Sequence, residues 1–279
     1  MKNDDIVITS AFRTAIGKFS GSLSSQTAPE LGSTVIKKCV ENSELKKEEV
    51  DMVYMGQVLT AGTGQNPARQ ASILAGLPHE TTNTTVNQVC GSGLASVALA
   101  YNSIKCGDGK LVIAGGQESM SNSPHYMNIR KGIKMGDGKL KDSMIIDGLW
   151  DVYNQYHMGI TAENVAEKFQ IRREEQDSFA AASQRKAAEA IKEKKFVNEI
   201  VPVKIKFKKE EIEFDKDEYP KAESTVEKLA KLSPTFKKDG TVTAGNASGV
   251  NDGAAAVCLM TGEMANQKDI EPLAKIVSW

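Results

Sequence analysis

The first residue that could carry chemistry is Cys90, which follows the β-branched stretch "TTVNQV" and precedes the tripeptide "GSG". This pattern predicts a strand that ends at a cysteine and a helix that begins directly after it. A thiolate is stabilised at the N-terminal end of a helix, and glycines let a substrate approach the backbone. One hypothesis is therefore that Cys90 is a nucleophile, with its own N–H facing a developing oxyanion. The alternative is a small buried thiol.

Two further stretches contain side chains that suit a small-molecule site. His157 lies in "YHMG", where an imidazole acts either as a catalyst or as a structural hydrogen-bonding group. The stretch "TAGNASGVNDGAAA", residues 243–256, consists largely of small residues, so backbone groups can reach a ligand, and Ser248 adds a hydroxyl. The alternative for this second stretch is a tight glycine loop that leads into a packed strand.

Apolar patterns predict the elements that must position these residues. Strands are predicted at "DIVITSAF", "VDMVYMGQVL", "TTVNQV" and "LVIAGG", with helices between them, and one helix is predicted to begin at Asn66 as N-cap and Pro67 as first residue. Strands that alternate with helices are typical of a mostly parallel α/β sheet covered on both faces. Residues 172–195 are predicted to form a long helix, and residues 201–214 a hairpin with one solvated face.

Composition excludes several classes of function. The 279 residues include 35 basic and 36 acidic side chains, so no nucleic-acid partner is expected. No apolar run is long enough to span a bilayer, and the start "MKNDDIVITS" lacks a secretory or transit signal, which predicts a cytoplasmic protein without a membrane partner. The four cysteines and three histidines show no metal-ligand spacing, so neither a metal site nor a disulfide framework is predicted.

Four long segments together resemble those of the thiolases, in the same order and at the same spacing. They are "NQVCGSGLASVALA", "GGQESMSNSPH", "YHMGITAENVAEKF" and "GNASGVNDGAAA", and they look most like the segments of biosynthetic acetyl-CoA acetyltransferases. The resemblance runs from "VITSAFRTAIGKFSGSL" to the last residue. It implies an α/β fold of the five-layer αβαβα kind, with a mixed sheet covered by helices, two similar halves and a loop-rich domain inserted in the first half.

The resemblance also implies an activity. Thiolases of this kind catalyse the reversible Claisen condensation of two acetyl-CoA molecules to acetoacetyl-CoA and CoA, through an acetyl-cysteine intermediate. Coenzyme A then serves as the substrate carrier, and no permanently bound cofactor is expected. The resemblance further implies a homo-oligomer, a dimer or tetramer in the complete protein, and a place in fatty acid metabolism.

The same resemblance assigns roles to individual residues. Cys90 matches the nucleophile that carries the acetyl group. His157 and Met158 match positions that line the acyl and pantetheine pocket, and Ser248 matches a residue that hydrogen-bonds the pantetheine. The remaining positions implied to bind CoA are Lys221 near the adenosine phosphates, the aromatic Phe236, and the lining residues Leu149, Gln184 and Ala244.

The sequence departs from the family pattern in three motifs. The N-E-A-F, G-H-P and C-x-G-G-G motifs of the second thiolase half do not occur in it, so the C-terminal half is predicted to be absent. We therefore expect an N-terminal core domain at residues 1–120 and 250–270, an inserted CoA-binding loop domain at 121–249, and the first strand of a missing C-terminal domain at 271–279. Such a chain should bind CoA weakly, turn over poorly alone, and self-associate through exposed apolar surface.

Two other functions remain open on the sequence. A condensing enzyme of the β-ketoacyl synthase type shares the layered fold and the cysteine nucleophile. A non-catalytic CoA-binding or assembly module would use the same pocket without acylating Cys90.

Overall fold

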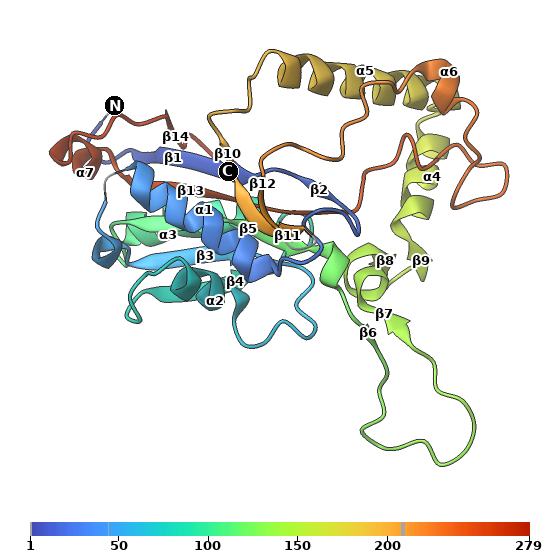
Figure 1. Ribbon diagram of the computed structural model, residues 1–279, viewed down its shortest axis with the longest axis horizontal. Helices are drawn as coiled ribbons and strands as arrows, with labels where there is room; N and C mark the ends of the chain where they lie inside the picture. The colour runs from blue at the N-terminus through green and yellow to red at the C-terminus, as the bar shows by residue number, and fades with distance from the viewer. Residues whose placement is uncertain (1, 44, 208–209) are drawn as a thin grey trace. The chain divides into compact units, whose positions relative to one another are not determined.

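The computed structural model describes residues 2–43, 45–207 and 210–279 (Figure 1). The chain divides into two compact units. The first comprises Met1–Pro124, Glu199–Glu218 and Asn251–Trp279, and the second comprises His125–Asn198 and Tyr219–Val250.

A mixed β-sheet forms the centre of the first unit. The strands follow the order β10-β1-β13-β5-β3-β4, with the short strands β14 beside β1 and β2 beside β13. Strand β3 pairs in parallel with β4 and β5, whereas β13 pairs antiparallel with both β1 and β5. The predicted mixed sheet is confirmed. The antiparallel pairing of the long strand β13 is what the expectation of a mostly parallel sheet missed. The strands are β1 (Ile6–Thr14), β2 (Gly17–Lys18), β3 (Met52–Gly56), β4 (Thr82–Val86), β5 (Val112–Ser119), β10 (Ile200–Val201), β13 (Asn251–Thr261) and β14 (Ala274–Lys275).

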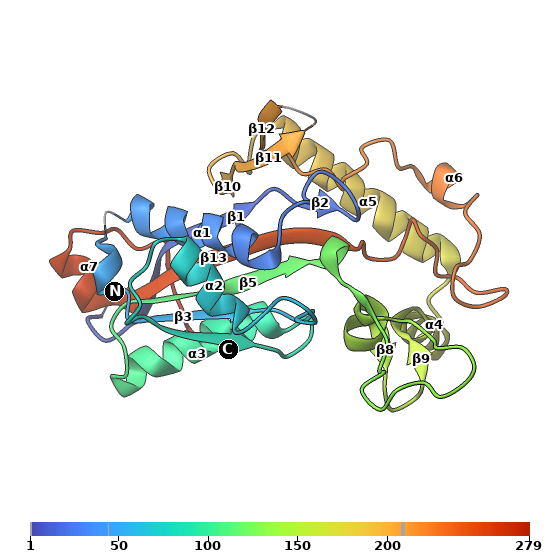
Figure 2. The same cartoon turned by 60° about the horizontal axis from the view of Figure 1, so that its bottom comes forward.

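Helices cover both faces of this sheet because its strands are apolar on both sides. Helices α1 (Ala28–Asn42) and α2 (Pro67–Leu74) pack with the alternate side chains Val53, Ile113 and Cys258. Helix α3 (Ser92–Cys106) packs on the opposite face against Val112, Ala114 and Leu259. In Figure 2, strands β13, β5 and β3 run between α1 and α3. The short elements η1 (Lys47–Glu49), η2 (Met120–Asn122) and α7 (Gly262–Gln267) complete this unit.

Local capping explains where the helices begin. The Asn66 side chain accepts a hydrogen bond from the Arg69 N–H, and Pro67 is the first helical residue of α2, so the predicted start is confirmed. Thr27 caps α1 in the same way, with Glu30 closing a capping box. Helix α3 ends at Gly107, whose φ of 83° is a left-handed conformation that glycine adopts at little cost.

The second unit consists of helices joined by long irregular segments. Helix α4 (Met158–Lys168) was not predicted, whereas α5 (Arg173–Lys192) confirms the long helix expected at 172–195. The other elements are α6 (Val226–Leu229), the π-helix η3 (Met144–Leu149) and two small ladders, β6 (His125–Tyr126) with β7 (Lys141–Asp142) and β8 (Trp150–Asp151) with β9 (Tyr156–His157).

One segment, Glu199–Glu218, belongs to a different compact unit from the one that its sequence position suggests. Glu199–Glu218 lies inside the predicted inserted domain, 121–249, but it belongs to the first unit. Strand β10 pairs with β1, and Arg13 binds the carboxylates of Glu199 and Asp217. The predicted hairpin follows as β11 (Val203–Phe207) and β12 (Glu210–Phe214), and residues 208–209 of its expected turn lie outside the described residues.

The predicted last strand is short in the structure. Within residues 271–279, only Ala274 and Lys275 form a strand, β14, which pairs antiparallel with Ile8 and Val7 of β1. These residues thus extend the sheet of the first unit. Their assignment to a further domain stays a prediction.

Candidate active site

Cys90 lies on a tight turn between the end of β4 and the start of α3, and it is exposed. The preceding residue, Val89, has a φ of 49°. This left-handed conformation is rare for a β-branched residue, and such strain persists only where the surroundings impose it. The predicted strand–cysteine–helix junction is therefore present, and it contains a strained residue next to the thiol.

Hydrogen bonds within the turn hold this strained conformation. The Ser92 hydroxyl donates to the Val89 carbonyl at 2.6 Å and accepts from the Gln88 N–H at 2.8 Å. The Val89 N–H in turn donates to Asn87 Oδ1 at 2.9 Å. Because Gly91 is the N-cap of α3 and has no side chain, no capping group shields the helix end beside Cys90.

The glycine at position 56 lets this turn and helix lie close to the sheet. A Cβ built on Gly56, at the end of β3, would come within 2.5 Å of the Ser92 carbonyl carbon and 2.7 Å of the Gly93 nitrogen. A Cβ on Gly116 of β5 would lie 3.5 Å from the Cα of Gly93. The backbone of α3 therefore rests directly on the backbone of two strands, which fixes the height of Cys90 above them.

The segment after Gly56 is fixed as well. The Gln57 N–H donates to the Val86 carbonyl, and the N–H groups of Val58 and Leu59 donate to the Glu118 carboxylate at 2.9 and 3.1 Å. Burial raises the pKa of Glu118 although these two hydrogen bonds act to lower it. Glu118, from the predicted motif "GGQESMSNSPH", thus anchors the loop that follows the strand beneath the cysteine turn.

A cavity of about 900 Å³ lies along α3 beside the cysteine turn. Asn87, Gln88 and Gly91, which flank Cys90, form one end of its lining. The remaining lining is largely apolar and includes Leu94, which is 81% exposed, and Trp279, which is 72% exposed. The cavity therefore reaches residues on both sides of Cys90 in the sequence.

The other cysteines differ in environment. Cys39 and Cys258 are fully buried in the sheet core, and burial raises the pKa of each thiol to about 12. Cys106, at the opposite end of α3 from Cys90, is exposed. Only Cys90 and Cys106 among the four thiols are accessible to a reagent, and only Cys90 adjoins the first turn of a helix.

In the second unit, His157 is the N-cap of α4. Its Nδ1 accepts a hydrogen bond from the Gly159 N–H at 3.0 Å, and its ring stacks on Phe236 with centroids 4.8 Å apart. A Cβ on Gly159 would fall 2.2 Å from the Phe236 ring, so only glycine allows this stack. His157 thus has a structural hydrogen-bonding role, as one of the two sequence hypotheses expected. Its stack on Phe236 brings together two of the residues implied to bind CoA.

Of four other implied residues, Leu149 ends η3 directly before β8, and Met158 begins α4 directly after β9. The Gln184 side chain on α5 accepts a hydrogen bond from the Lys221 N–H at 2.8 Å. This hydrogen bond places Gln184 beside Lys221.

The last two implied residues are Ala244, which lies within a tight turn over residues 243–247, and Ser248, which directly follows it. The Ala247 N–H donates to the Thr243 carbonyl, and Asn246 Oδ1 accepts from the Thr243 N–H at 2.7 Å. Thr243 is fully buried, whereas Ala244 and Ser248 are exposed. The turn therefore presents these two implied CoA contacts to solvent, which confirms the tight loop but leaves their binding role a prediction.

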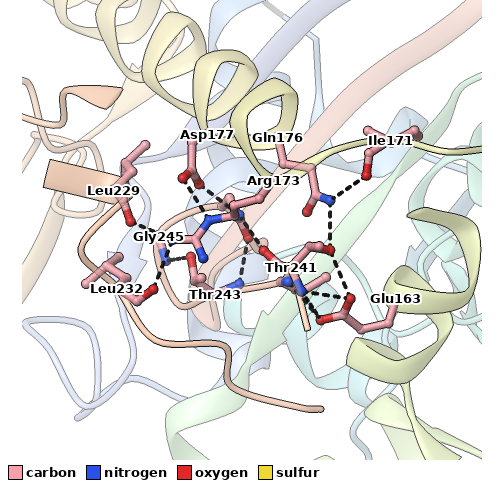
Figure 3. A network of polar contacts seen from close by, with 12 residues as sticks. Glu163, Ile171, Arg173, Gln176, Asp177, Leu229, Leu232, Thr241, Thr243 and Gly245 are labelled. Carbon is pink, nitrogen blue, oxygen red and sulfur yellow. Dashed lines mark hydrogen bonds and ion pairs between the residues drawn. The ribbon is translucent and has the colours of Figure 1, made fainter. Parts of the chain in front are cut away.

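Buried carboxylates hold the inner side of this turn (Figure 3). Glu163 of α4 accepts hydrogen bonds from the N–H groups of Thr241 and Val242, and Asp177 of α5 accepts from Asn246 Nδ2 and Arg173 Nε. Burial acts to raise the pKa of Glu163, but the hydrogen bonds from Val242 and Thr241 outweigh it, and the pKa is lowered. Neither acid was predicted from the sequence. The available signal was the spacing of Gly159, Glu163 and Ala166 along one helical face.

Comparisons with known proteins agree with this architecture. The sequence pattern of the thiolase N-terminal domain matches residues 6–263, and the chain belongs to the thiolase family. An acetyl-CoA acetyltransferase of Rhizobium meliloti is 55% identical over 279 residues, which are 100% of this chain and 71% of the relative. One from Chromobacterium violaceum is 58% identical over 98% of this chain and 70% of its own length. The crystal structure of the Bacillus anthracis acetyl-CoA acetyltransferase superposes with a TM-score of 0.95 at 41% identity, covering 99% of this chain and 71% of that one.

Membrane-spanning helices and metal-ligand clusters are both absent from the described residues. No helix in this part of the chain is long and apolar enough to cross a membrane. No group of three or more His, Cys, Asp or Glu side chains among the same residues is arranged to hold a metal ion.

Proposed function

We propose that the chain acts as an acetyl-CoA C-acetyltransferase in which Cys90 carries the acetyl group. The observation that supports this proposal most directly is an exposed thiol on a strained turn at the start of a helix, in a chain of the thiolase family. The names of the relatives support acetyl-CoA as the substrate.

In the first half-reaction, the Cys90 sulfur attacks the thioester carbonyl of acetyl-CoA. The new S–C bond forms as the bond from the carbonyl carbon to the CoA sulfur breaks, and the proton lost from Cys90 ends on the CoA thiol. Both bonds are thioesters, so the acetyl group moves with little change in free energy. The backbone N–H of Cys90 is the proposed donor to the oxyanion that develops on the carbonyl.

In the second half-reaction, a second acetyl-CoA loses a methyl proton, and the resulting carbanion attacks the acetyl carbon on Cys90. A C–C bond forms as the bond from the acetyl carbon to the Cys90 sulfur breaks, the proton lost from the methyl group ends on the Cys90 sulfur, and acetoacetyl-CoA leaves. The family's G-H-P and C-x-G-G-G motifs, which the resemblance connects with activation and proton transfer, do not occur in these 279 residues. We therefore propose that this chain alone performs the first half-reaction better than the second.

Coenzyme A enters this proposal as a substrate carrier. The eight residues proposed to contact it all belong to the second unit: Leu149, His157, Met158, Gln184, Lys221, Phe236, Ala244 and Ser248. The exposed turn with Ala244 and Ser248 suits the pantetheine arm, since its amides and hydroxyl can pair with the arm's two amide groups.

The test is acylation of the 279-residue chain by acetyl-CoA, followed by mass analysis of the intact chain and of its cysteine peptides. We expect one acetyl group on the Cys90 peptide and none in Cys90→Ala. Cys106 is the internal control, because it is equally a free, exposed thiol but lies at the other end of α3. Acetylation of Cys106 to the same extent would contradict a specific role for the cysteine turn.

A second outcome of the same experiment defines the alternative function. If CoA binds but Cys90 stays unmodified, the chain is a CoA-binding module rather than an acyl carrier. The separation of all eight proposed CoA contacts into one compact unit is the observation that favours this alternative. The match to the thiolase family favours either function over a β-ketoacyl synthase.

A further inference from the structure

The exposed turn that presents Ala244 and Ser248 is held from inside by two buried acids on different helices. We infer that Glu163 and Asp177 are positioning residues for the segment Thr241–Asn246, and that through it they set the affinity of the chain for the pantetheine arm of CoA. This inference rests on the proposed function, because it assumes that the turn is a CoA contact. Neither carboxylate takes part in acyl transfer.

Glu163 holds the start of the segment. Its Oε1 accepts from the N–H groups of Thr241 and Val242, both at 2.8 Å, and its Oε2 accepts from the Thr241 hydroxyl at 2.9 Å. The residue is only 4% exposed. Gly240 leaves the room for this carboxylate, since a Cβ there would lie 2.3 Å from Oε1.

Asp177 holds the end of the segment. Its Oδ1 accepts from Asn246 Nδ2 at 2.9 Å, and the same amide nitrogen donates to the Thr241 carbonyl at 3.1 Å. Asn246 therefore connects the acid to both the start and the end of the segment. Asp177 is 1% exposed, and its Oδ2 binds Arg173 Nε at 2.7 Å.

Arg173 extends the network to α6. Its Nη2 donates to the carbonyls of Leu229 and Leu232 at 2.7 and 2.9 Å (Figure 3). The Leu229 and Leu232 side chains reach the far side of the turn, because a Cβ on Gly245 would lie 2.6 and 2.5 Å from them. The turn is thus enclosed by polar contacts on one side and by two leucines on the other.

Burying two carboxylates is a costly way to fill a core, since apolar side chains of similar volume often stabilise a fold better. An apolar side chain could not, however, accept hydrogen bonds from consecutive backbone N–H groups. Charge-assisted bonds to backbone N–H groups are short and directional, so they select one backbone conformation of the segment. These acids therefore fix the conformation of the turn and do not serve to stabilise the unit as a whole.

Glu163→Gln and Asp177→Asn test this assignment, with Glu167→Gln as the matched control. The Glu163→Gln change keeps the shape of the side chain, but the new NH2 group then faces an N–H or a hydroxyl donor. Glu167 lies one turn further along α4 and its side chain is 71% exposed, in a surface pair with Lys237. CoA affinity is measured by calorimetry on the 279-residue chain. The rate at which iodoacetamide alkylates Cys90 is measured on the same samples.

We expect both buried-acid variants to weaken CoA binding about tenfold, as the loss of one charge-assisted hydrogen bond predicts. Glu167→Gln should bind as the unaltered chain does, and Cys90 alkylation should be the same in all four proteins. Amide hydrogen exchange should rise in residues 241–247 of the two variants and not throughout α4 and α5.

Three results would overturn the inference. Equal CoA affinity in the unaltered chain and both variants would remove the positioning role and leave the proposed function intact. Faster exchange throughout α4 and α5 would show that the acids stabilise the whole unit instead of the turn. No CoA binding by the unaltered chain would remove the proposed CoA site itself, and the positioning role with it.

Discussion

At the scale of single residues, the cysteine turn depends on the lack of a side chain at Gly56 as well as on its own hydrogen bonds. Val89 adopts a φ of 49°, a conformation that costs a β-branched residue of order 1–3 kcal/mol. The Ser92 hydroxyl holds this conformation, and the absence of a side chain at Gly56 leaves room for the backbone of Ser92 and Gly93. Strain next to Cys90 is therefore accompanied by close backbone packing beneath it.

Gly56→Ala should disturb this packing. The new methyl group would lie 2.5 Å from the Ser92 carbonyl carbon, which is backbone and cannot rotate away. We expect the free energy of unfolding in urea to fall by roughly 1–3 kcal/mol, the range for overpacking, and Cys90 acetylation to slow. Gly109→Ala is the matched control in the same unit, because its methyl group would meet ordinary contacts at 3.4 Å and beyond. Equal effects of the two changes would contradict the role given to Gly56.

At the scale of elements, the predictions that succeeded were local ones. The start of α2 follows from Asn66 and Pro67 alone, and the junction at Cys90 follows from a β-branched run before a helical pattern. The start of α4 was missed because its N-cap is His157, which ranks below Ser, Thr, Asp and Asn as a capping signal. The stack of Phe236 on His157 joins residues far apart in the sequence, so no local pattern could reveal it.

Long-range ion pairs explain why the placement of the segment Glu199–Glu218 was not predicted from the sequence. The segment Glu199–Glu218 joins the first unit because Arg13 on β1 binds Glu199 at 2.6 Å and Asp217 at 2.7 Å. The Ile16 N–H adds a further hydrogen bond to Asp217, 201 positions along the chain. Pairing over such a distance leaves no periodicity in the sequence.

Asp217→Asn should loosen this segment. The substitution removes the charge that faces Arg13 and so weakens the pairing of a largely buried guanidinium. We expect the free energy of unfolding at neutral pH to fall by roughly 1–3 kcal/mol. Glu211→Gln is the control, because its pair with Lys204 is on the solvated face of the β11–β12 hairpin and is mostly exposed.

The difference in unfolding free energy between the unaltered chain and Asp217→Asn should change with pH in a definite direction. Burial acts to raise the pKa of Asp217, but the Arg13 and Ile16 hydrogen bonds outweigh it and lower the pKa below the ordinary value of 3.8. A carboxyl with a lowered folded-state pKa stabilises the fold above its ordinary pKa and loses that contribution as the pH falls. The difference between the unaltered chain and Asp217→Asn should therefore be constant near neutrality and shrink below about pH 4. A difference that grows on acidification would contradict the assignment.

At the scale of the whole molecule, the outer face of α3 is more apolar than an ordinary solvated surface. Leu94 is 81% exposed and Leu99 is 39% exposed on this helix, and Trp279 on the lining of the same cavity is 72% exposed. Contiguous apolar surface of this kind favours association between proteins. Because the cavity reaches the residues that flank Cys90, association on this face would also cover the approach to the cysteine turn.

We therefore expect the purified chain to self-associate, with a sedimentation coefficient that rises with protein concentration. Leu94→Gln should shift this equilibrium toward the smaller species, because it removes the most exposed apolar side chain of α3 without altering the buried face of the helix. Leu273→Gln is the control: Leu273 is 65% exposed in the same unit but lies outside the cavity lining. If both variants associate as the unaltered chain does, another surface must carry the contact. If Leu94→Gln dissociates and Cys90 is then acetylated faster, the α3 face both holds the assembly together and limits access to the thiol.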